Sequence, residues 1–184
     1  MGNYECTKLE TRNRIKQSFW GLYKTRNIEK ITVKNITDAC GIYRTTFYLH
    51  FTDVYAILEE IEGEVFQKLT EIRTDMERRE YIHTLQSIYT EDIDYMKILL
   101  DERRNPEFAG RYKSELTARI CCLYKIDIQT LKPDSIRIVR KTFSMIIDLI
   151  FAQKDLEESF MEDVVEIVEG YLNRGIINTI NEKM

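Results

Sequence analysis

Residues 32–51 read TVKNITDACGIYRTTFYLHF, and this stretch predicts two short helices joined by a glycine turn. Val33, Ile36 and Cys40 recur at offsets of three and seven residues, so they share one face of the first helix. Gly41 follows directly, and glycine adopts the positive φ that a tight turn between helices requires. The spacing therefore predicts a helix-turn-helix.

The second helix of this motif has an inward and an outward face. Phe47 and Phe51 are four residues apart and should point toward a core. The outward face offers hydroxyls, one guanidinium and one imidazole but no carboxylate, as an anionic DNA groove would favour. Lys34, in the first helix of the motif, adds a positive charge. The candidate DNA-binding residues are therefore Lys34, Tyr43, Arg44, Thr45, Thr46, Tyr48 and His50. A helical hairpin without any ligand is the alternative.

The stretch resembles the TetR family of bacterial transcriptional regulators, whose pattern is roughly TVxxIAxxAGVSxGTFYxHF. The resemblance covers about residues 8–68, and the TFYxHF ending is quite specific. Three positions depart from it: Tyr43 replaces a helix-capping Ser, Thr45 replaces a small Gly, and Val54 replaces a phosphate-contacting Lys. The matching residues are Thr32, Val33, Ile36, Ala39, Gly41, Ile42, Thr46, Phe47, Tyr48, His50 and Phe51.

The composition favours an all-α fold. The 184 residues are 43% hydrophobic, and only two prolines and seven glycines interrupt them, so long stretches lack helix breakers. The sequence has no apolar run of membrane-spanning length and no signal-peptide core near its start, so we expect a cytoplasmic protein without a membrane partner. The four cysteines show no metal-ligand spacing.

The charge is distributed unevenly along the chain. The net charge is −4, yet residues 1–52 carry nine Lys and Arg against four Asp and Glu, a net of +5. The remaining residues, 53–184, carry −9. A basic segment that contains the helix-turn-helix is typical of a DNA-binding domain, so we divide the chain at residue 52.

Two further helices should flank the motif. The first is predicted over about Lys8–Arg26, where Arg12 and Arg14 are either phosphate contacts or members of a solvated face. Thr32 can cap the first motif helix, and Asp53 can cap a rod-like helix that runs to about Arg79. In the resembled family, a helix of this kind transmits the ligand state to the DNA-binding heads.

Residues 53–184 are predicted to form a helical effector-binding and dimerisation domain. The segments 136–151 and 158–173 are apolar on more than one face, and the resemblance implies a homodimer built on them. Candidate interface residues are Phe143, Ile147, Ile150, Val164, Val168 and Tyr171. The candidate residues of an effector pocket are Tyr89, Met96, Tyr112, Cys121 and Met145. The alternative for each of them is that its side chain simply fills the core.

No pattern in the chain indicates catalysis. It contains two histidines, no nucleotide-binding or nucleophile motif and no HExxH, so we expect no enzyme, no cofactor and no metal. Asp148, in a very apolar segment, is an interface hydrogen bonder, a pocket group or a solvent-exposed residue. The expected function is a TetR-like repressor released from operator DNA by a small molecule. An activator, or an interaction module that has lost DNA binding, is the alternative.

Overall fold

A computed structural model describes residues 2–91, 93–126, 132–152 and 158–171. Within these ranges the chain is all-α and contains no strand, as the composition predicts. It divides into two compact units, residues 1–67 and residues 68–184. The boundary falls inside a helix, fifteen residues after the division at residue 52 that the sequence suggested.

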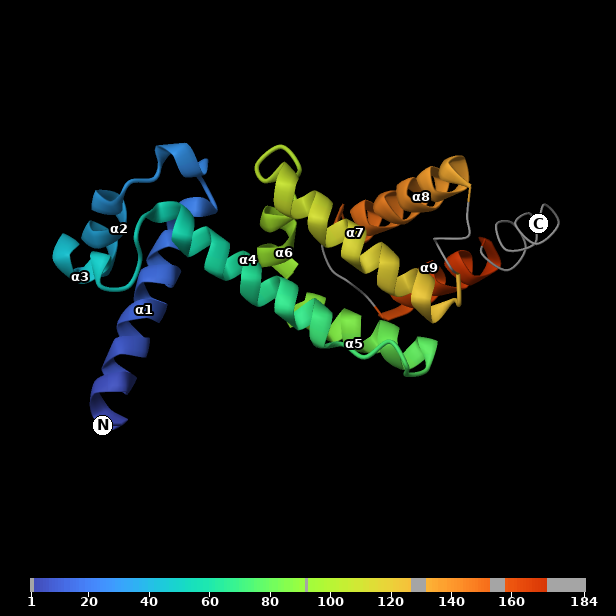
Figure 1. Ribbon diagram of the computed structural model, residues 1–184, viewed down its shortest axis with the longest axis horizontal. Helices are drawn as coiled ribbons and strands as arrows, with labels where there is room; N and C mark the ends of the chain where they lie inside the picture. The colour runs from blue at the N-terminus through green and yellow to red at the C-terminus, as the bar shows by residue number, and fades with distance from the viewer. Residues whose placement is uncertain (1, 92, 127–131, 153–157, 172–184) are drawn as a thin grey trace. The chain divides into compact units, whose positions relative to one another are not determined.

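The first unit is organised around four helices and one short turn of 3-10 helix (Figure 1). These elements are α1 (Gly2–Tyr23), η1 (Ile28–Lys30), α2 (Val33–Cys40), α3 (Arg44–Tyr48) and the start of α4 (Val54–Glu71). Helix α2 packs against both α1 and α3. The first helix begins earlier and ends sooner than its predicted range of Lys8–Arg26.

Apolar residues from α1, α2 and α3 close a small core in the first unit. Phe19 and Phe47 are completely buried, and Phe19 stacks on Tyr23 with ring centroids 5.3 Å apart. Leu22 of α1 is only half-buried. The buried apolar side chains described in this unit are Ile15, Phe19, Trp20, Tyr23, Ile31, Ile36, Cys40, Phe47 and Phe51, together with Val54, Ile57, Leu58, Ile61 and Val65 of the α4 segment.

Helix α4 is shorter than the sequence suggested. Asp53 caps its start as predicted, because Asp53 Oδ1 accepts a hydrogen bond of 2.8 Å from the backbone N–H of Ala56. The helix ends at Glu71 rather than near Arg79, and its eighteen residues span roughly 27 Å. At that end the Arg119 guanidinium donates to the carbonyls of Thr70 and Ile72, at 2.8 and 2.7 Å. These bonds satisfy carbonyls that a terminating helix leaves without partners.

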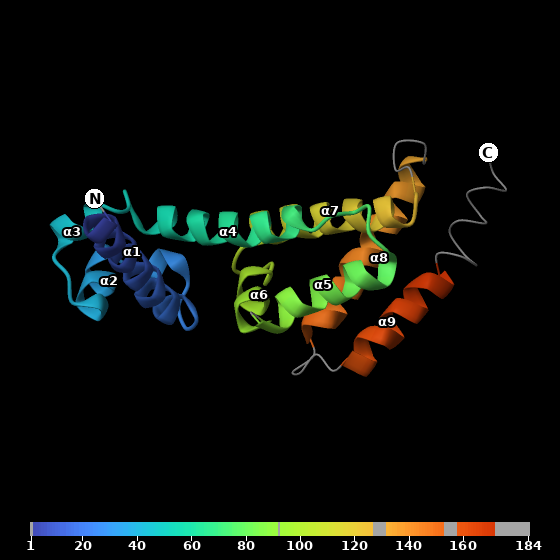
Figure 2. The same cartoon turned by 90° about the horizontal axis from the view of Figure 1, so that it is seen from below.

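The second unit contains the other five helices of the described chain. They are α5 (Arg78–Glu91), α6 (Ile93–Leu99), α7 (Pro106–Leu123), α8 (Pro133–Ala152) and α9 (Glu158–Tyr171). Pro106 occupies the first turn of α7, and Asn105 Oδ1 accepts a hydrogen bond from the Phe108 N–H as the N-cap. Helices α7 and α8 lie side by side (Figure 2).

Helix α8 presents apolar residues on two different faces. Val139, Phe143 and Ile147 recur every four residues and are buried within the second unit. Ile138 and Met145, seven residues apart, are 53% and 66% exposed. Helix α8 is therefore apolar on two faces, as its sequence predicts, but other helices of the second unit cover only one of them. No helix in the described ranges is long and apolar enough to cross a bilayer.

Candidate nucleic-acid interface

Local side-chain bonds fix the start of α2. Thr32 Oγ1 accepts a hydrogen bond of 3.2 Å from the Asn35 N–H, and Asn35 Oδ1 accepts one of 3.0 Å from the Thr32 N–H. This reciprocal pair is a capping box, with Asn in the position usually held by Glu or Gln. The predicted capping role of Thr32 is confirmed, and residue 35 adds a partner that the sequence analysis did not name.

The turn between α2 and α3 depends on Gly41. Its φ of 66° and ψ of 40° lie in the left-handed region, where a side chain would be strained. Its N–H, and that of Ile42 at 3.1 Å, both donate to the carbonyl of Thr37. The second bond belongs to the Schellman pattern, which ends α2 and redirects the chain into α3.

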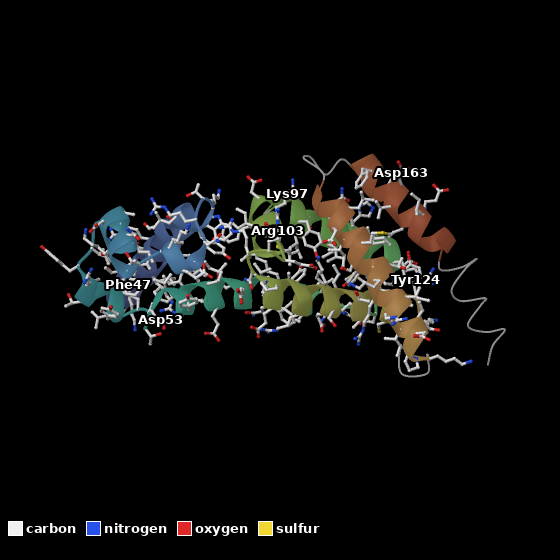
Figure 3. The ribbon with its side chains drawn as sticks, turned by 90° about the horizontal axis from the view of Figure 1, so that it is seen from above. Phe47, Asp53, Lys97, Arg103, Tyr124 and Asp163 are labelled. Carbon is white, nitrogen blue, oxygen red and sulfur yellow. The ribbon has the colours of Figure 1, made fainter. Side chains whose placement is uncertain are left out.

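Helix α3 presents the face that the sequence assigned to DNA. Phe47 is fully buried and holds the helix to the core, whereas Tyr43 and Tyr48 are 83% and 58% exposed. Arg44 and Thr45 are exposed at the start of the helix. Figure 3 labels Phe47 in the first unit and Asp53 after the end of α3. The outward face of α3 therefore carries one guanidinium and several hydroxyls, with no acidic residue on the helix itself.

The other residues predicted to contact DNA are less exposed or have a charged neighbour. Thr46 is half-buried, and Lys34 is exposed on α2 but lies 3.4 Å from Asp38 one turn later, which partly balances its charge. Tyr43 stands at the N-cap of α3 without a side-chain hydrogen bond to the helix. The departure from a capping Ser thus leaves the start of α3 without a side-chain cap.

Arg12 is a structural residue of the first unit, not a free phosphate contact. Its Nε donates a 2.9 Å hydrogen bond to Glu60 on α4, and its Nη2 bonds the other oxygen of the same carboxylate. Its Nη1 donates to the backbone carbonyl of His50 at 2.6 Å, and its guanidinium lies 4.2 Å from the centre of the Phe51 ring. We call this arrangement the Arg12 clamp, because it ties α1 and α4 to the segment that ends the motif.

Burial and two nearby positive charges lower the pKa of His50. Burial lowers the pKa of the His50 imidazole, and the positive charges of Arg12 and Lys8 lower it further. Its Nδ1 is buried and has no hydrogen-bond partner in the described part of the chain. A neutral, half-buried imidazole offers a hydrogen bond to a phosphate rather than a positive charge.

Two exposed residues beside α3 were missed by the sequence analysis. Leu49, directly after the helix, is 77% exposed, and Tyr55 in the first turn of α4 is 57% exposed. Large exposed side chains of this kind often mark contact surfaces. The alternation within FYLHF could have indicated Leu49, since Phe47 and Phe51 fix the buried face and place Leu49 opposite.

The predicted effector residues are only partly brought together. Tyr89 and Tyr112 are buried, and their hydroxyl oxygens lie 2.9 Å apart. Met96 and Cys121 are buried as well, and burial raises the pKa of the Cys121 thiol to about 11. Met145, in contrast, is 66% exposed on α8, so its placement in a pocket is not supported.

The second unit does contain a small apolar cavity of about 80 Å³. Tyr89 is the one predicted pocket residue that lines it. Tyr124, labelled in Figure 3, is another lining residue, together with Tyr81, Leu85, Leu116, Ile146 and Ile150. The volume is well below the 300–1,000 Å³ typical of ligand pockets, so any sizeable ligand would require the helices to move.

The predicted dimer residues are mostly interior ones. Phe143 and Ile147 are 2% exposed and Val164 is 9% exposed, and all three line the apolar cavity. Ile150 also lines it and is half-buried. The side chains of Val168 and Tyr171 lie outside the described part of the chain. Among the side chains of these two helices that the structure describes, the large exposed apolar ones are Ile138, Met145 and Leu149 on α8 and Ile167 on α9.

Comparison of the chain with family models, with curated proteins and with solved structures gave no match.

Proposed function

We propose that this protein is a TetR-like transcriptional regulator that binds double-stranded DNA through α2 and α3. The observation that carries the proposal is the outward face of α3, where Arg44, Thr45 and Tyr48 are exposed and no carboxylate competes with a phosphate. Behind that face, Phe47 is fully buried, so the helix has a fixed orientation. The net charge of +5 over residues 1–52 adds electrostatic attraction to DNA.

The two ends of α3 would have different roles on the duplex. Arg44 and Thr45 stand at the start of the helix, from which a recognition helix addresses base edges in the major groove. Tyr48 lies at its last residue and would donate its hydroxyl to the phosphate backbone. Helix α3 has only five residues, so one copy would read few base pairs and bind weakly.

Because a single helix-turn-helix would bind DNA weakly, we expect the protein to bind DNA as a homodimer. The exposed residues Ile138, Met145 and Leu149 form an apolar stripe on α8, and Ile167 is 69% exposed on α9. Pairing two such surfaces would remove them from water, at roughly 25 cal/mol for each Å² of apolar area. Two linked heads would bind with a large gain in avidity and would require a palindromic operator.

A small-molecule effector completes the proposed regulation. The apolar cavity lies among helices α5, α7, α8 and α9 and is closed by residues such as Tyr89 and Phe143. The hydroxyls of Tyr89 and Tyr112 lie 2.9 Å apart and bond to each other, so the cavity walls offer an effector apolar contacts. Release of repression is the default mechanism for proteins of this kind, and activation is the alternative.

Selection of bound sequences from a random pool of duplex DNA tests this proposal. The full-length chain is expected to enrich a palindrome with half-sites about one helical turn, roughly 34–36 Å, apart or a multiple of that distance. A matched selection with Arg44→Ala should change the enriched bases at symmetric positions. Failure of the wild-type chain to enrich any sequence over the input pool would contradict the proposal.

A second candidate function is an interaction module that contacts another protein through the same surface. It is favoured by the exposed aromatic and apolar side chains of Tyr43, Leu49 and Tyr55. The dependence of DNA retention on salt distinguishes the two functions. DNA binding releases counterions and weakens steeply as salt rises, whereas an apolar protein contact changes little.

A further inference from the structure

A groove between α7 and α8 shares none of its lining residues with the apolar cavity of the same unit. Its volume is about 500 Å³, within the range of small-molecule sites. The side chains that line it include Lys113 and Ser114 of α7 and Arg137, Arg140 and Lys141 of α8. All of them belong to the second unit, so the groove is complete within that unit.

The basic residues of α8 are arranged along a single face. Arg137, Arg140, Lys141 and Ser144 occupy offsets of zero, three, four and seven residues, which is one stripe of a helix. The exposed apolar stripe that contains Met145 follows a different face. A ligand in the groove and a partner on the apolar stripe would therefore use separate surfaces of α8.

Acidic residues balance only part of this positive charge. Lys113 Nζ donates hydrogen bonds to Glu102 at 2.8 Å and to Asp148 at 2.5 Å, and Arg137 pairs with Asp134 at 3.2 Å. Asp148, whose role the sequence left open, is thus a partially exposed partner of a buried lysine.

Arg140 and Lys141 keep their charges available. Both are exposed, and in the described ranges neither forms a salt bridge with a carboxylate. The hydrogen bond and charge of Lys113 lower the pKa of Glu102, and the charge of Lys141, which also lines the groove, lowers it further. Arg140 and Lys141 therefore line the groove without a salt bridge in the described ranges, and Glu102, which also lines it, is hydrogen-bonded to Lys113.

The wall that faces these cations is made of small polar residues. Gly110, Ser114 and Thr117 recur at offsets of four and seven residues along α7. A Cβ added at Gly110 would meet no atom within 4 Å, so open space adjoins this position. Such a wall leaves room for a ligand. Its exposed hydroxyl is that of Ser114, because Thr117 is buried and donates a 2.7 Å hydrogen bond to the Lys113 carbonyl.

We propose that this groove binds a small molecule that carries a phosphoryl group. Arg140 supplies a planar fork that matches two phosphoryl oxygens, Lys141 adds a point charge, and the hydroxyls of Ser114 and Ser144 donate further hydrogen bonds. The acidic character of residues 53–184, which repels the backbone of DNA, favours a small molecule as the ligand. This site goes beyond the proposed function and does not depend on it.

Calorimetric titration of the full-length protein with inorganic phosphate, at constant ionic strength set by chloride, tests the site. The double variant Arg140→Gln, Lys141→Gln is expected to weaken phosphate binding at least about tenfold, because both charge-assisted contacts are lost. Arg79→Gln, which removes an exposed cation at the start of α5, is the matched control and should bind as the wild type does. Arg44→Gln controls for phosphate bound at α3 and should not change binding in the groove.

A second variant separates a shaped site from general charge attraction. Gly110→Leu leaves every cation in place but projects a side chain into the open space, so it should also abolish phosphate binding. The proposal is overturned if the wild type shows no saturable binding of phosphate. It is also overturned if Gly110→Leu binds normally, or if the double variant loses affinity for duplex DNA while keeping its affinity for phosphate.

Discussion

The substitution Glu60→Gln probes the Arg12 clamp while leaving the shape of the side chain almost unchanged. Glu60 accepts two hydrogen bonds from Arg12 and lies 3.4 Å from Lys16 Nζ. Arg12 and Glu60 remain 34% and 25% exposed, so solvent screens the pair, and the loss of its charge should cost about 1 kcal/mol of stability. The bond from Arg12 to the His50 carbonyl would remain but lose its fixed donor geometry.

Urea unfolding followed by Trp20 fluorescence measures this effect. Trp20 is the only tryptophan of the chain and is 6% exposed in the core of the first unit, so its emission reports that unit. The matched control is Glu59→Gln, an exposed neighbour on α4 that should change stability by less than about 0.5 kcal/mol. Equal destabilisation by the two substitutions would refute the clamp.

The same clamp predicts a dependence on pH. Burial alone would raise the pKa of Glu60, but the hydrogen bond and charge of Arg12, together with Lys16, lower it in the folded state. Because the pKa of Glu60 is lower in the folded chain than in the unfolded chain, its ionised form stabilises the fold. This stabilisation is fully present above the pKa of Glu60 in the unfolded chain, about 4.3, and is lost as the pH falls through the pKa in the folded chain. The stability difference between wild type and Glu60→Gln should therefore shrink below about pH 4.

Three further predictions concern the other surfaces of the chain. Arg44→Ala should relax base preference at one operator position by about 1–3 kcal/mol, whereas Tyr48→Phe should weaken binding to all sequences alike; equal losses on every sequence for both would contradict the roles assigned to them. Met145→Glu should convert a dimer to a monomer in sedimentation without changing helix content, whereas Ile147→Glu should unfold the second unit because its side chain is only 2% exposed. Cys122 is exposed and Cys121 is buried with its pKa raised to about 11, so a thiol reagent at pH 8 should modify Cys122 much faster than Cys121; similar rates would mean that the region opens.

Local chemistry made much of the first unit predictable from the sequence. The Thr32 cap, the left-handed Gly41 and the buried Phe47 depend on residues within a few positions of one another, so spacing alone indicated them. The outward face of α3 followed from the same periodicity. The all-α character followed from the scarcity of helix breakers.

Long-range contacts could not be predicted in this way. Arg12 looked like a candidate phosphate contact because its partner Glu60 lies 48 residues further along the chain. Asp148 likewise accepts a hydrogen bond from Lys113, which lies 35 residues earlier in the sequence.

The sequence also could not predict which face of a buried helix points toward the core. In an α8 that is apolar on two faces, periodicity cannot say which face the rest of the fold covers, so the sequence did not show that Met145 is exposed and Ile147 buried within the second unit. The carbonyls at the end of α4 accept hydrogen bonds from Arg119, which lies 47 and 49 residues from Ile72 and Thr70 in the sequence.

Equilibrium binding of the full-length chain to a fluorescently labelled duplex, measured by anisotropy across a range of salt concentrations, tests the central claim most directly. The account predicts binding at low salt that weakens linearly on a plot of log K against log salt, and a strong loss of affinity in Arg44→Glu. The control Lys125→Glu, an exposed residue after α7, should bind DNA as the wild type does. Absence of binding at low salt, or the same affinity in Arg44→Glu as in the wild type, would contradict the assignment of α3 to DNA.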